Sequence, residues 1–330
     1  MKTEAPWVLP LWLLCLVAAL GQRQAAAQGS VQGQPPYVGP ATETVAPDIP
    51  GVVKGGTRIE VVKEGFQGTE GPIALPDGSL IFTEGDRITK IDKDGKTSTF
   101  LEDTNRANGL AFDAKGRLIA AQGNRVGVIY PNGNGAVFTD NFEGKPYLRP
   151  NDLVVDKKGG VYFTDFTFVP PGQKVAPAPG SLPPAVYYVR PGGQAIKVAE
   201  DGRPNGIILS PGEKTLYINT DGEYLLAFDV QNDGTLTNRR DFGKYAGIPP
   251  GQTPRGDGLA VDSEGRVYAV MTGGVQVFSP TGQHLGNIPF SRVPQNLAFG
   301  GPDKKTLYVV GRGVVFKVPM LAQGYKGRAK

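Results

Sequence analysis

The sequence predicts an all-β fold, a six-bladed β-propeller, and three observations lead to this prediction. First, one unit recurs along the chain: a polar residue, a short apolar strand, a tight turn and a second apolar strand. Second, successive copies start 38 to 54 residues apart, a period typical of blade-forming repeats. Third, the chain contains 47 glycines, as expected for many tight turns. The six copies begin at what we call the opening residues, namely Glu70, Asn108, Asn151, Asn205, Asp257 and Gln295.

The strands of each repeat can be placed by the same pattern. The first blade should contain four strands, at 73–75, 80–83, 88–92 and 97–101. The sixth blade supplies only three clear strands, whereas residues 57–62 form a strand pattern without a partner of its own. We predict that this N-terminal strand completes the last blade and closes the ring, because closure limits exposed strand edges. The predicted propeller spans residues 56–320.

The direction of the strands places the opening residues together. Each repeat starts at one face of the disc, its first strand lines the central channel, and its second strand returns to the starting face. The six opening residues should therefore surround one mouth of the channel. A proline-rich and glycine-containing insertion, residues 166–184, follows a second strand and should lie over the same mouth as a wall or a lid.

The two ends of the chain lie outside the repeats. Residues 1–27 combine Lys2, an apolar run and three alanines before Gln28, which is typical of a cleaved signal peptide. We expect export to the periplasm or secretion, with an uncleaved anchor as the alternative and no stable membrane insertion after cleavage. Residues 28–55 are rich in Gly, Pro, Gln and Thr, which predicts a linker that is disordered or loosely draped on the domain. Residues 321–330 are assigned to a C-terminal tail.

Composition excludes several classes of function. The net charge is +4 and the basic residues are scattered, so nucleic-acid binding is not expected. The only cysteine, Cys15, lies in the predicted signal peptide, so the mature chain would have neither disulfides nor a thiol nucleophile. The only histidine, His284, is expected in an outer strand, away from any partner for a catalytic triad. We expect a monomer.

The opening residues bring a set of hard oxygen ligands to the mouth. Glu70 and Asp257 contribute carboxylates, and Asn108, Asn151 and Asn205 contribute amide carbonyls. Such a set suits Ca²⁺, which binds roughly six to eight oxygens. Mg²⁺, Mn²⁺ and Zn²⁺ are other candidate divalent cations, although zinc prefers the nitrogen and sulfur ligands that are scarce in this chain.

Turn formation competes with metal binding as the role of each single opening residue. Asn and Asp before glycine are common in turns, where they accept local hydrogen bonds and tolerate positive φ. Two carboxylates that converge on one axis, however, would repel each other without a cation between them. Their equivalent positions in separate blades therefore favour a bound cation.

Four motifs resemble those of the SMP-30/gluconolactonase/LRE-like family of six-bladed, calcium-dependent lactonases. The resemblance covers roughly residues 65–318, and its motifs are Glu70-Gly71-Pro72, Arg149-Pro150-Asn151-Asp152, Arg203-Pro204-Asn205-Gly206 and Gly256-Asp257-Gly258. It implies that Glu70, Asn205 and Asp257 hold the metal. Asn151 corresponds to a residue that binds metal or substrate, depending on the member, and Arg149 to one that contacts the sugar. Asn108, at the equivalent position of blade two, is a further candidate for substrate contact.

The resemblance implies a hydrolase that opens a small lactone, above all a sugar lactone. Asp257 corresponds to the residue with the acid/base role, so we expect it to take the proton from the attacking water. The metal would polarise the carbonyl, and Arg149 would orient the substrate unless it serves a structural salt bridge. Gln295-Asn296 stands where the phosphotriesterase branch has a histidine. Two alternatives remain open: hydrolysis of other small esters or phosphotriesters on the same metal, and a non-catalytic ligand-binding propeller.

Other polar residues are expected to have structural roles, or their role is left undecided by the sequence. Turn formation is expected for the aspartates that end first strands at the opposite face, namely Asp113, Asp156 and Asp262. Packing between blades is expected for four tyrosines at matching second-strand positions, namely Tyr162, Tyr217, Tyr268 and Tyr308. Asp152 either assists the site or braces its loop. Candidates for substrate contact in loops of the active face are Glu84, Asp86 and Asp221.

Overall fold

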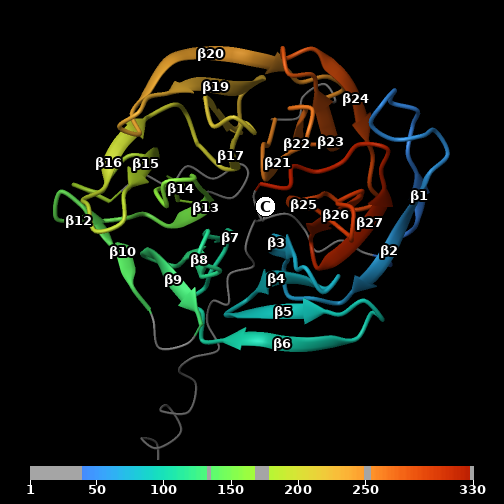
Figure 1. The fold of residues 1–330 in the computed structure, drawn as a ribbon, viewed down its shortest axis with the longest axis horizontal. Coiled ribbons are helices and arrows are strands. Elements are labelled where there is room, and N and C mark those ends of the chain that lie inside the picture. The colour runs from blue at the N-terminus through green and yellow to red at the C-terminus, as the bar shows by residue number, and fades with distance from the viewer. Residues whose placement is uncertain (1–38, 132–134, 168–177, 249–253, 328–330) are drawn as a thin grey trace, which may run out of the picture.

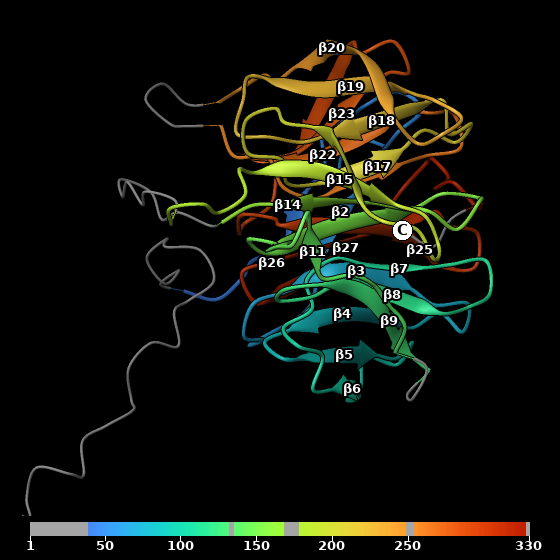
Figure 2. The same cartoon turned by 90° about the vertical axis from the view of Figure 1, so that its left-hand side faces the viewer.

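Six antiparallel sheets stand around a common axis, each with its first strand nearest the centre and its later strands towards the rim (Figure 1). The computed structural model describes residues 39–131, 135–167, 178–248 and 254–327, and helices are absent from these ranges. In the view turned by 90°, β6 and β20 again lie at opposite sides of the molecule (Figure 2). The prediction of an all-β, six-bladed propeller is confirmed.

The first five blades each contain four strands, and those of blade one lie within three residues of their predicted bounds. Blade one contains β3 (Glu70–Ala74), β4 (Leu80–Glu84), β5 (Arg87–Ile91) and β6 (Thr97–Glu102). Blade two contains β7 (Leu110–Phe112), β8 (Leu118–Ala121), β9 (Val126–Tyr130) and β10 (Val137–Thr139). Blade three contains β13 (Pro150–Val155), β14 (Val161–Asp165), β15 (Ala185–Val189) and β16 (Ile196–Ala199). Blade four contains β17 (Ile207–Leu209), β18 (Thr215–Ile218), β19 (Tyr224–Val230) and β20 (Leu236–Lys244). Blade five contains β21 (Leu259–Val261), β22 (Val267–Met271), β23 (Gly274–Phe278) and β24 (His284–Ile288). Between blades two and three, β11 (Asn141–Phe142) pairs with β12 (Lys145–Pro146).

Blade six combines strands from both ends of the described chain. It contains β25 (Asn296–Gly300), β26 (Thr306–Gly311), β27 (Val314–Pro319), β2 (Arg58–Glu64) and β1 (Thr44–Val45), in the order β1-β2-β27-β26-β25. The pairing of β2 with β27 is antiparallel and places Glu60 opposite Lys317 and Val61 opposite Phe316.

Residues 39–55 differ from the expectation of a disordered linker. Ile49, Val52 and Val53 are fully buried and belong to the hydrophobic cluster between blades five and six. The carbonyl oxygen of Val52 also accepts hydrogen bonds from the backbone N–H groups of Leu321 and Ala322. The segment has too few apolar residues to show a periodic pattern, but these three are buried against blades five and six, so residues 39–55 are packed on the domain rather than disordered.

The core is a series of apolar clusters, and aromatic side chains connect several adjacent blades. Tyr268 packs edge-on against Phe299 of the next blade, with ring centroids 5.0 Å apart, a contact worth about 1 kcal/mol beyond its buried area. The hydroxyl of Tyr162 donates to the carbonyl oxygen of Gly234, which follows the third strand of blade four, at 2.9 Å. All four tyrosines predicted to pack between blades lie in or against these clusters.

The turns at the opposite face follow one pattern. The Oδ1 atom of Asp113 accepts the backbone N–H groups of Lys115 and Arg117, both at 2.9 Å. Asp156 and Asp262 make the equivalent pairs of hydrogen bonds. The expected turn role of these three aspartates is confirmed, because their oxygens satisfy backbone donors that the tight turn leaves open.

The predicted signal peptide, residues 1–27, lies outside the described residues. Within the described ranges, no helix has the length and apolar character needed to span a membrane. The segment expected to be a tail packs on the domain as far as it is described: the backbone N–H of Gly324 donates to the carbonyl oxygen of Lys304 at 2.8 Å, and Ala322 is buried.

Candidate metal and substrate site

The opening residues of neighbouring blades contact one another around the axis. The backbone N–H of Gly109 donates to the carbonyl oxygen of Asn151 at 2.7 Å, which connects blades two and three. The backbone N–H of Gly258 donates to the carbonyl oxygen of Gln295 at 2.8 Å, which connects blades five and six. Backbone hydrogen bonds therefore fix the spacing of the opening residues at these two junctions.

Glycine is required where two other junctions bring backbones together. A side-chain carbon at Gly71, which has a φ of +50°, would collide with the carbonyl oxygen of Asn108. A side-chain carbon at Gly206 would collide with the carbonyl oxygen of Asp257. The Glu70-Gly71 and Asn205-Gly206 pairs thus allow these two opening residues to lie directly against the next blade.

Two amides of blade six hold the Glu70 carboxylate in place. The Nε2 atom of Gln295 donates to Oε1 of Glu70 at 3.2 Å, and Nδ2 of Asn296 donates to Oε2 at 3.0 Å. The backbone N–H of Gly71 adds a longer bond of 3.3 Å to Oε2. Asn296 was not singled out from the sequence as a site residue, although it stands directly beside Gln295. These donors fix the orientation of the Glu70 carboxylate.

Burial raises the pKa of Glu70 from 4.5 to about 7. The hydrogen bond from Asn296 lowers this pKa, the negative charge of Asp152 raises it, and the positive charge of Arg312 lowers it. Burial lowers the pKa of the Arg312 guanidinium, and the negative charges of Asp257 and Glu70 oppose this shift. The two predicted carboxylate ligands therefore share one electrostatic environment, in which a cation would stabilise the ionised form of Glu70.

Asp152 braces the junction between blades three and four. It is only 1% exposed, and its carboxylate accepts the backbone N–H groups of Leu153 at 2.9 Å and Ile207 at 3.3 Å. These contacts favour the bracing role over direct assistance at the site. Its charge nevertheless adds to the negative potential that Glu70 experiences.

Two amide oxygens at the mouth are buried without a hydrogen-bond partner among the described residues: Oδ1 of Asn108 and Oδ1 of Asn205. Buried polar oxygens are rarely left unpaired in native structures, so each one is available to a water molecule, a cation or a substrate. The described chain contains no group of three or more His, Cys, Asp or Glu side chains arranged for a metal. The predicted set has two carboxylates and several amides, and it fits a hard cation that accepts neutral oxygen ligands.

Asn219 links two of the predicted metal ligands. Its Nδ2 group donates to the carbonyl oxygen of Asp257 at 2.8 Å, and its own carbonyl oxygen accepts the backbone N–H of Asn205 at 2.8 Å. The hydroxyl of Tyr245 donates to Oδ1 of Asn219 at 2.7 Å and so fixes the orientation of the amide. Asn219 is fully buried, and no sequence pattern marked it, because its side-chain contacts with Asp257 and Tyr245 lie outside its own strand pair.

The loop that carries Arg149 is fixed by Asp165, the last residue of β14. The Asp165 carboxylate accepts the backbone N–H groups of Leu148 at 2.9 Å and Arg149 at 2.6 Å. Burial raises the pKa of Asp165 to about 6, while these two hydrogen bonds lower it. Burial also lowers the pKa of the Arg149 guanidinium, as does the positive charge of Arg106, whereas Glu70 raises it. Arg149 therefore lies close to the predicted metal ligands.

The same anchoring device recurs at the ends of other second strands. Glu84 accepts the backbone N–H of Gln67 at 3.0 Å, and the hydroxyl oxygen of Thr272 accepts that of Arg255 at 3.1 Å. Glu84 is also bonded to Arg87 and Thr89. It therefore anchors a loop, which does not favour the substrate contact for which it was a candidate. A polar residue at the same place in several second strands is the sequence signal that could have identified these anchors.

The other two candidates for substrate contact are also engaged. The Asp86 carboxylate accepts the backbone N–H of Arg106 at 2.6 Å, and Asp221 pairs with Arg203 at 2.6 Å. The Arg203 guanidinium lies 4.3 Å above the ring of Phe166, at the start of the insertion 166–184. Residues 168–177 of that insertion lie outside the described residues, so its role as a wall or lid stays a prediction.

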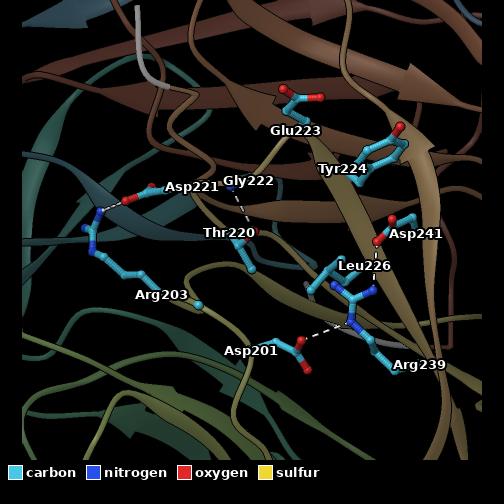
Figure 3. Close-up of a pocket in the computed structure, with 11 residues that line it drawn as sticks. Asp201, Arg203, Thr220, Asp221, Gly222, Glu223, Tyr224, Leu226, Arg239 and Asp241 are labelled. Atoms are coloured by element: carbon cyan, nitrogen blue, oxygen red, sulfur yellow. Dashed lines mark hydrogen bonds and ion pairs between the residues drawn. The ribbon is translucent and has the colours of Figure 1, made fainter.

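A pocket of about 520 Å³ lies on blade four beside this loop (Figure 3). Its lining includes two ion-paired groups: Arg203 with Asp221, and Arg239 between Asp201 at 2.9 Å and Asp241 at 2.8 Å. The opening residues are not part of its lining. Its lining carries four acidic side chains and two arginines, and it shares no residue with the ring of opening residues, so we distinguish this pocket from the oxygen-rich mouth.

Comparison with known proteins agrees with the motifs. Residues 68–312 match the model of the SMP-30/gluconolactonase/LRE-like region. This chain belongs to the SMP-30/gluconolactonase/LRE-like family. The matched range contains every opening residue, so the resemblance inferred from the four motifs is confirmed.

Individual members of this family resemble the chain over most of its length. It is 28% identical over 318 aligned residues to a gluconolactonase of Zymomonas mobilis, which covers 86% of each protein. It is 30% identical over 247 residues to the lactonase drp35 of Staphylococcus saprophyticus, covering 70% of this chain and 72% of that one. A solved gluconolactonase of Xanthomonas campestris matches with a TM-score of 0.73 at 27% identity, covering 88% of this chain and 99% of that one.

Proposed function

We propose that this family member is a lactone hydrolase that acts on sugar lactones at the mouth formed by its opening residues. Similarity to a gluconolactonase over 86% of both chains supports the reaction class. The buried, unpaired oxygens of Asn108 and Asn205 carry the assignment of the site. Leaving such oxygens without a partner costs free energy, which a bound ligand at the mouth would offset.

Glu70, Asn205 and Asp257 would hold a divalent cation, with Asn151 as a further ligand. Ca²⁺ fits best, since the set consists of carboxylate and amide oxygens only; Mg²⁺, Mn²⁺ and Zn²⁺ are the other candidates. Glu70 is oriented by Gln295 and Asn296, while Asn205 and Asp257 are both tied to Asn219. A cation bound by these oxygens supplies Lewis-acid chemistry, which polarises a carbonyl group and acidifies a nearby water molecule.

Asp257 is the proposed general base. It is 9% exposed, and its backbone is held on both sides, by the N–H that donates to Val270 at 3.1 Å and by the carbonyl that accepts Asn219. Asp257 would take a proton from water as the water oxygen adds to the lactone carbonyl carbon. It would then return that proton to the ring oxygen as the ring C–O bond breaks, which yields the open hydroxy acid. Glu70 is the weaker candidate, because its two oxygens already accept three hydrogen bonds.

Arg149 and Asn108 are the proposed substrate contacts. Arg149 is oriented by its loop anchor, Asp165, and its side chain makes no ion pair or hydrogen bond within the described residues. This favours substrate orientation over the structural salt bridge that the sequence left open. Asn108 would contribute its unpaired Oδ1 to a substrate hydroxyl or, through water, to the cation.

The decisive experiment measures acid release from δ-gluconolactone in a pH-stat, with calcium and after chelation. We expect turnover with calcium, its loss on chelation, and loss of at least a thousandfold in kcat for Asp257→Asn with the fold preserved. Asp94→Asn, the same chemical change at an exposed turn of the opposite face, is the control. Turnover of a phosphotriester without any lactone would favour the alternative hydrolase, and inactivity on both would favour a binding propeller.

Three further statements belong to this proposal. The pairing of β2 with β27 supports closure of the ring by the N-terminal strand. Export to the periplasm or secretion, with residues 1–27 removed, would be checked by N-terminal sequencing of the mature protein. A monomeric state would be checked by light scattering.

A further inference from the structure

Arginine recurs at one position relative to the opening residues. It lies two residues before the opening residue in four successive blades, as Arg106, Arg149, Arg203 and Arg255. A fifth, Arg312, lies in the turn between β26 and β27, the turn that carries the second strand of blade six back from the same mouth. The oxygen-rich mouth is therefore bordered by guanidinium groups.

Two of these arginines, Arg149 and Arg312, lie near Glu70, and each has a second arginine beside it. Burial lowers the pKa of Arg149 and of Arg312, and the positive charges of Arg106 and Arg255, respectively, lower it further. Glu70 raises the pKa of both Arg149 and Arg312. Like charges are thus held close together beside the site, an arrangement that favours an anion between them.

Three of the five arginines have no protein partner of their own. The side chains of Arg106, Arg149 and Arg255 make no hydrogen bond or ion pair with any described residue. Arg203 differs, because it pairs with Asp221 and stacks on Phe166. Elsewhere in the domain, arginines such as Arg117, Arg239 and Arg266 are paired with carboxylates.

Within the described residues, no carboxylate pairs with these three arginines. The internal segments outside the described residues, 132–134, 168–177 and 249–253, contain no Asp or Glu, and one of them adds Lys174. The nearby acids Glu84, Asp86 and Asp165 are already occupied by backbone N–H groups. Glu70 acts on the charge of Arg149, whereas Arg106 has no carboxylate partner among the described residues. A dication bound at the mouth would add further positive charge.

We propose that Arg106 and Arg149 form an anion-binding pair, through which the enzyme prefers lactones that carry a carboxylate or phosphate group over neutral sugar lactones. This inference rests on the proposed lactone hydrolysis and names its substrate class. Guanidinium groups bind both anions through paired, charge-assisted hydrogen bonds. Arg149 is half-buried and Arg106 is exposed, and one charge-assisted contact of this kind corresponds to a preference of about tenfold to a hundredfold in kcat/KM.

Three lactones test this preference: neutral δ-gluconolactone, the carboxylate-bearing D-glucaro-1,4-lactone and the phosphate-bearing 6-phosphoglucono-δ-lactone. We expect kcat/KM for at least one anionic lactone to exceed that of gluconolactone at least tenfold, and this ratio to fall at high salt. Arg106→Gln should lower the ratio about tenfold. Lys115→Gln, which removes the same charge from an exposed turn of the opposite face, should leave the ratio unchanged. The two anionic lactones distinguish a carboxylate subsite from a phosphate subsite.

A binding measurement separates this inference from the proposed reaction. Calorimetry with the calcium-loaded protein compares 6-phosphogluconate and D-glucarate with gluconate, which shares their carboxylate but lacks the second anionic group. Tighter binding of 6-phosphogluconate or D-glucarate than of gluconate, weakened about tenfold by Arg106→Gln, supports the pair even if no lactone is hydrolysed. Equal kcat/KM for neutral and anionic lactones, together with equal affinity for the three acids, overturns the inference but does not contradict lactone hydrolysis.

Discussion

Raising the pH should destabilise the metal-free protein, and Glu70 is the main reason. Burial raises the pKa of Glu70 from 4.5 to about 7 in the folded protein. The folded state therefore holds a proton on Glu70 more tightly than the unfolded chain does. The stability that this group contributes is complete below about pH 4.5 and is lost as the pH rises through about 7.

The size of the effect follows from the shift. Each pKa unit corresponds to about 1.4 kcal/mol, so ionising Glu70 in the folded, metal-free protein costs about 3 kcal/mol of unfolding free energy. Typical domains are stable by about 5–15 kcal/mol, so the loss would be easy to measure. Asp165, whose pKa is raised to about 6, titrates in the same direction. A comparison with Glu70→Gln is therefore needed to isolate Glu70.

The assay is urea unfolding of chelated protein at pH 5, 6, 7 and 8. Wild type should lose about 3 kcal/mol more than Glu70→Gln over this range, because Asp165 titrates in both proteins. Adding calcium at pH 8 should stabilise wild type and have little effect on the variant. Glu102→Gln, on the exposed outer strand β6, controls for the chemical change. Equal pH slopes for wild type and Glu70→Gln would refute the burial argument, and equal calcium stabilisation would remove Glu70 from the metal.

Two substitutions test how the scaffold positions the site. In Asp165→Asn, the N–H group of Leu148 or of Arg149 would face an amide donor, so we expect the unfolding free energy to fall by about 1–3 kcal/mol. The KM for lactone should rise, with a smaller change in kcat. An unchanged KM would show that this anchor does not affect substrate binding. Gly206→Ala forces a side-chain carbon against the Asp257 carbonyl, so calcium titration should show weaker binding. Gly212→Ala is the control, because a side-chain carbon there meets no atom within 4 Å. Equal calcium affinity in both variants would show that the junction does not position Asp257.

Local patterns were sufficient to predict the blades but not the contacts between them. The strand pairs of blade one follow from alternation and turn signals over about ten residues, and the structure reproduces them. The hydrogen bonds from Gln295 and Asn296 to Glu70 join residues 225 and 226 positions apart. Arg312 reaches the site from a turn whose sequence resembles that of an ordinary hairpin. The symmetry of the repeat identified which residues lie at the mouth. Which of them form hydrogen bonds with one another depends on side-chain lengths, which the repeat does not encode.

The apolar residues of the N-terminal segment were missed for a related reason. Ile49, Val52 and Val53 lie among polar and glycine residues, and three buried side chains do not form a recognisable period. Their burial depends on a surface that exists only after blades five and six have formed. Composition alone therefore indicated a linker where tertiary packing orders the chain.

Some side-chain oxygens in these motifs accept a hydrogen bond from their own backbone, and others are unpaired. This difference helps to decide between turn formation and metal binding. Where an amide or carboxylate in these motifs serves its own backbone, the bond is visible: Oδ1 of Asn296 accepts the N–H of Leu297, and Oδ1 of Asp152 accepts that of Leu153, both at 2.9 Å. Oδ1 of Asn108 and Oδ1 of Asn205 make no such bond with the described residues.

A role in turn formation would require the Oδ1 atoms of Asn108 and Asn205 to accept a nearby backbone N–H, as the Oδ1 atoms of Asn296 and Asp152 do. Instead, loop N–H groups at the mouth are satisfied from elsewhere, by Asp165 and Thr272 at the ends of second strands. This division of roles keeps the amide oxygens of Asn108 and Asn205 available at the mouth. It favours a ligand-binding role for them, because a scaffold that needed them for its turns would not leave buried acceptors unpaired.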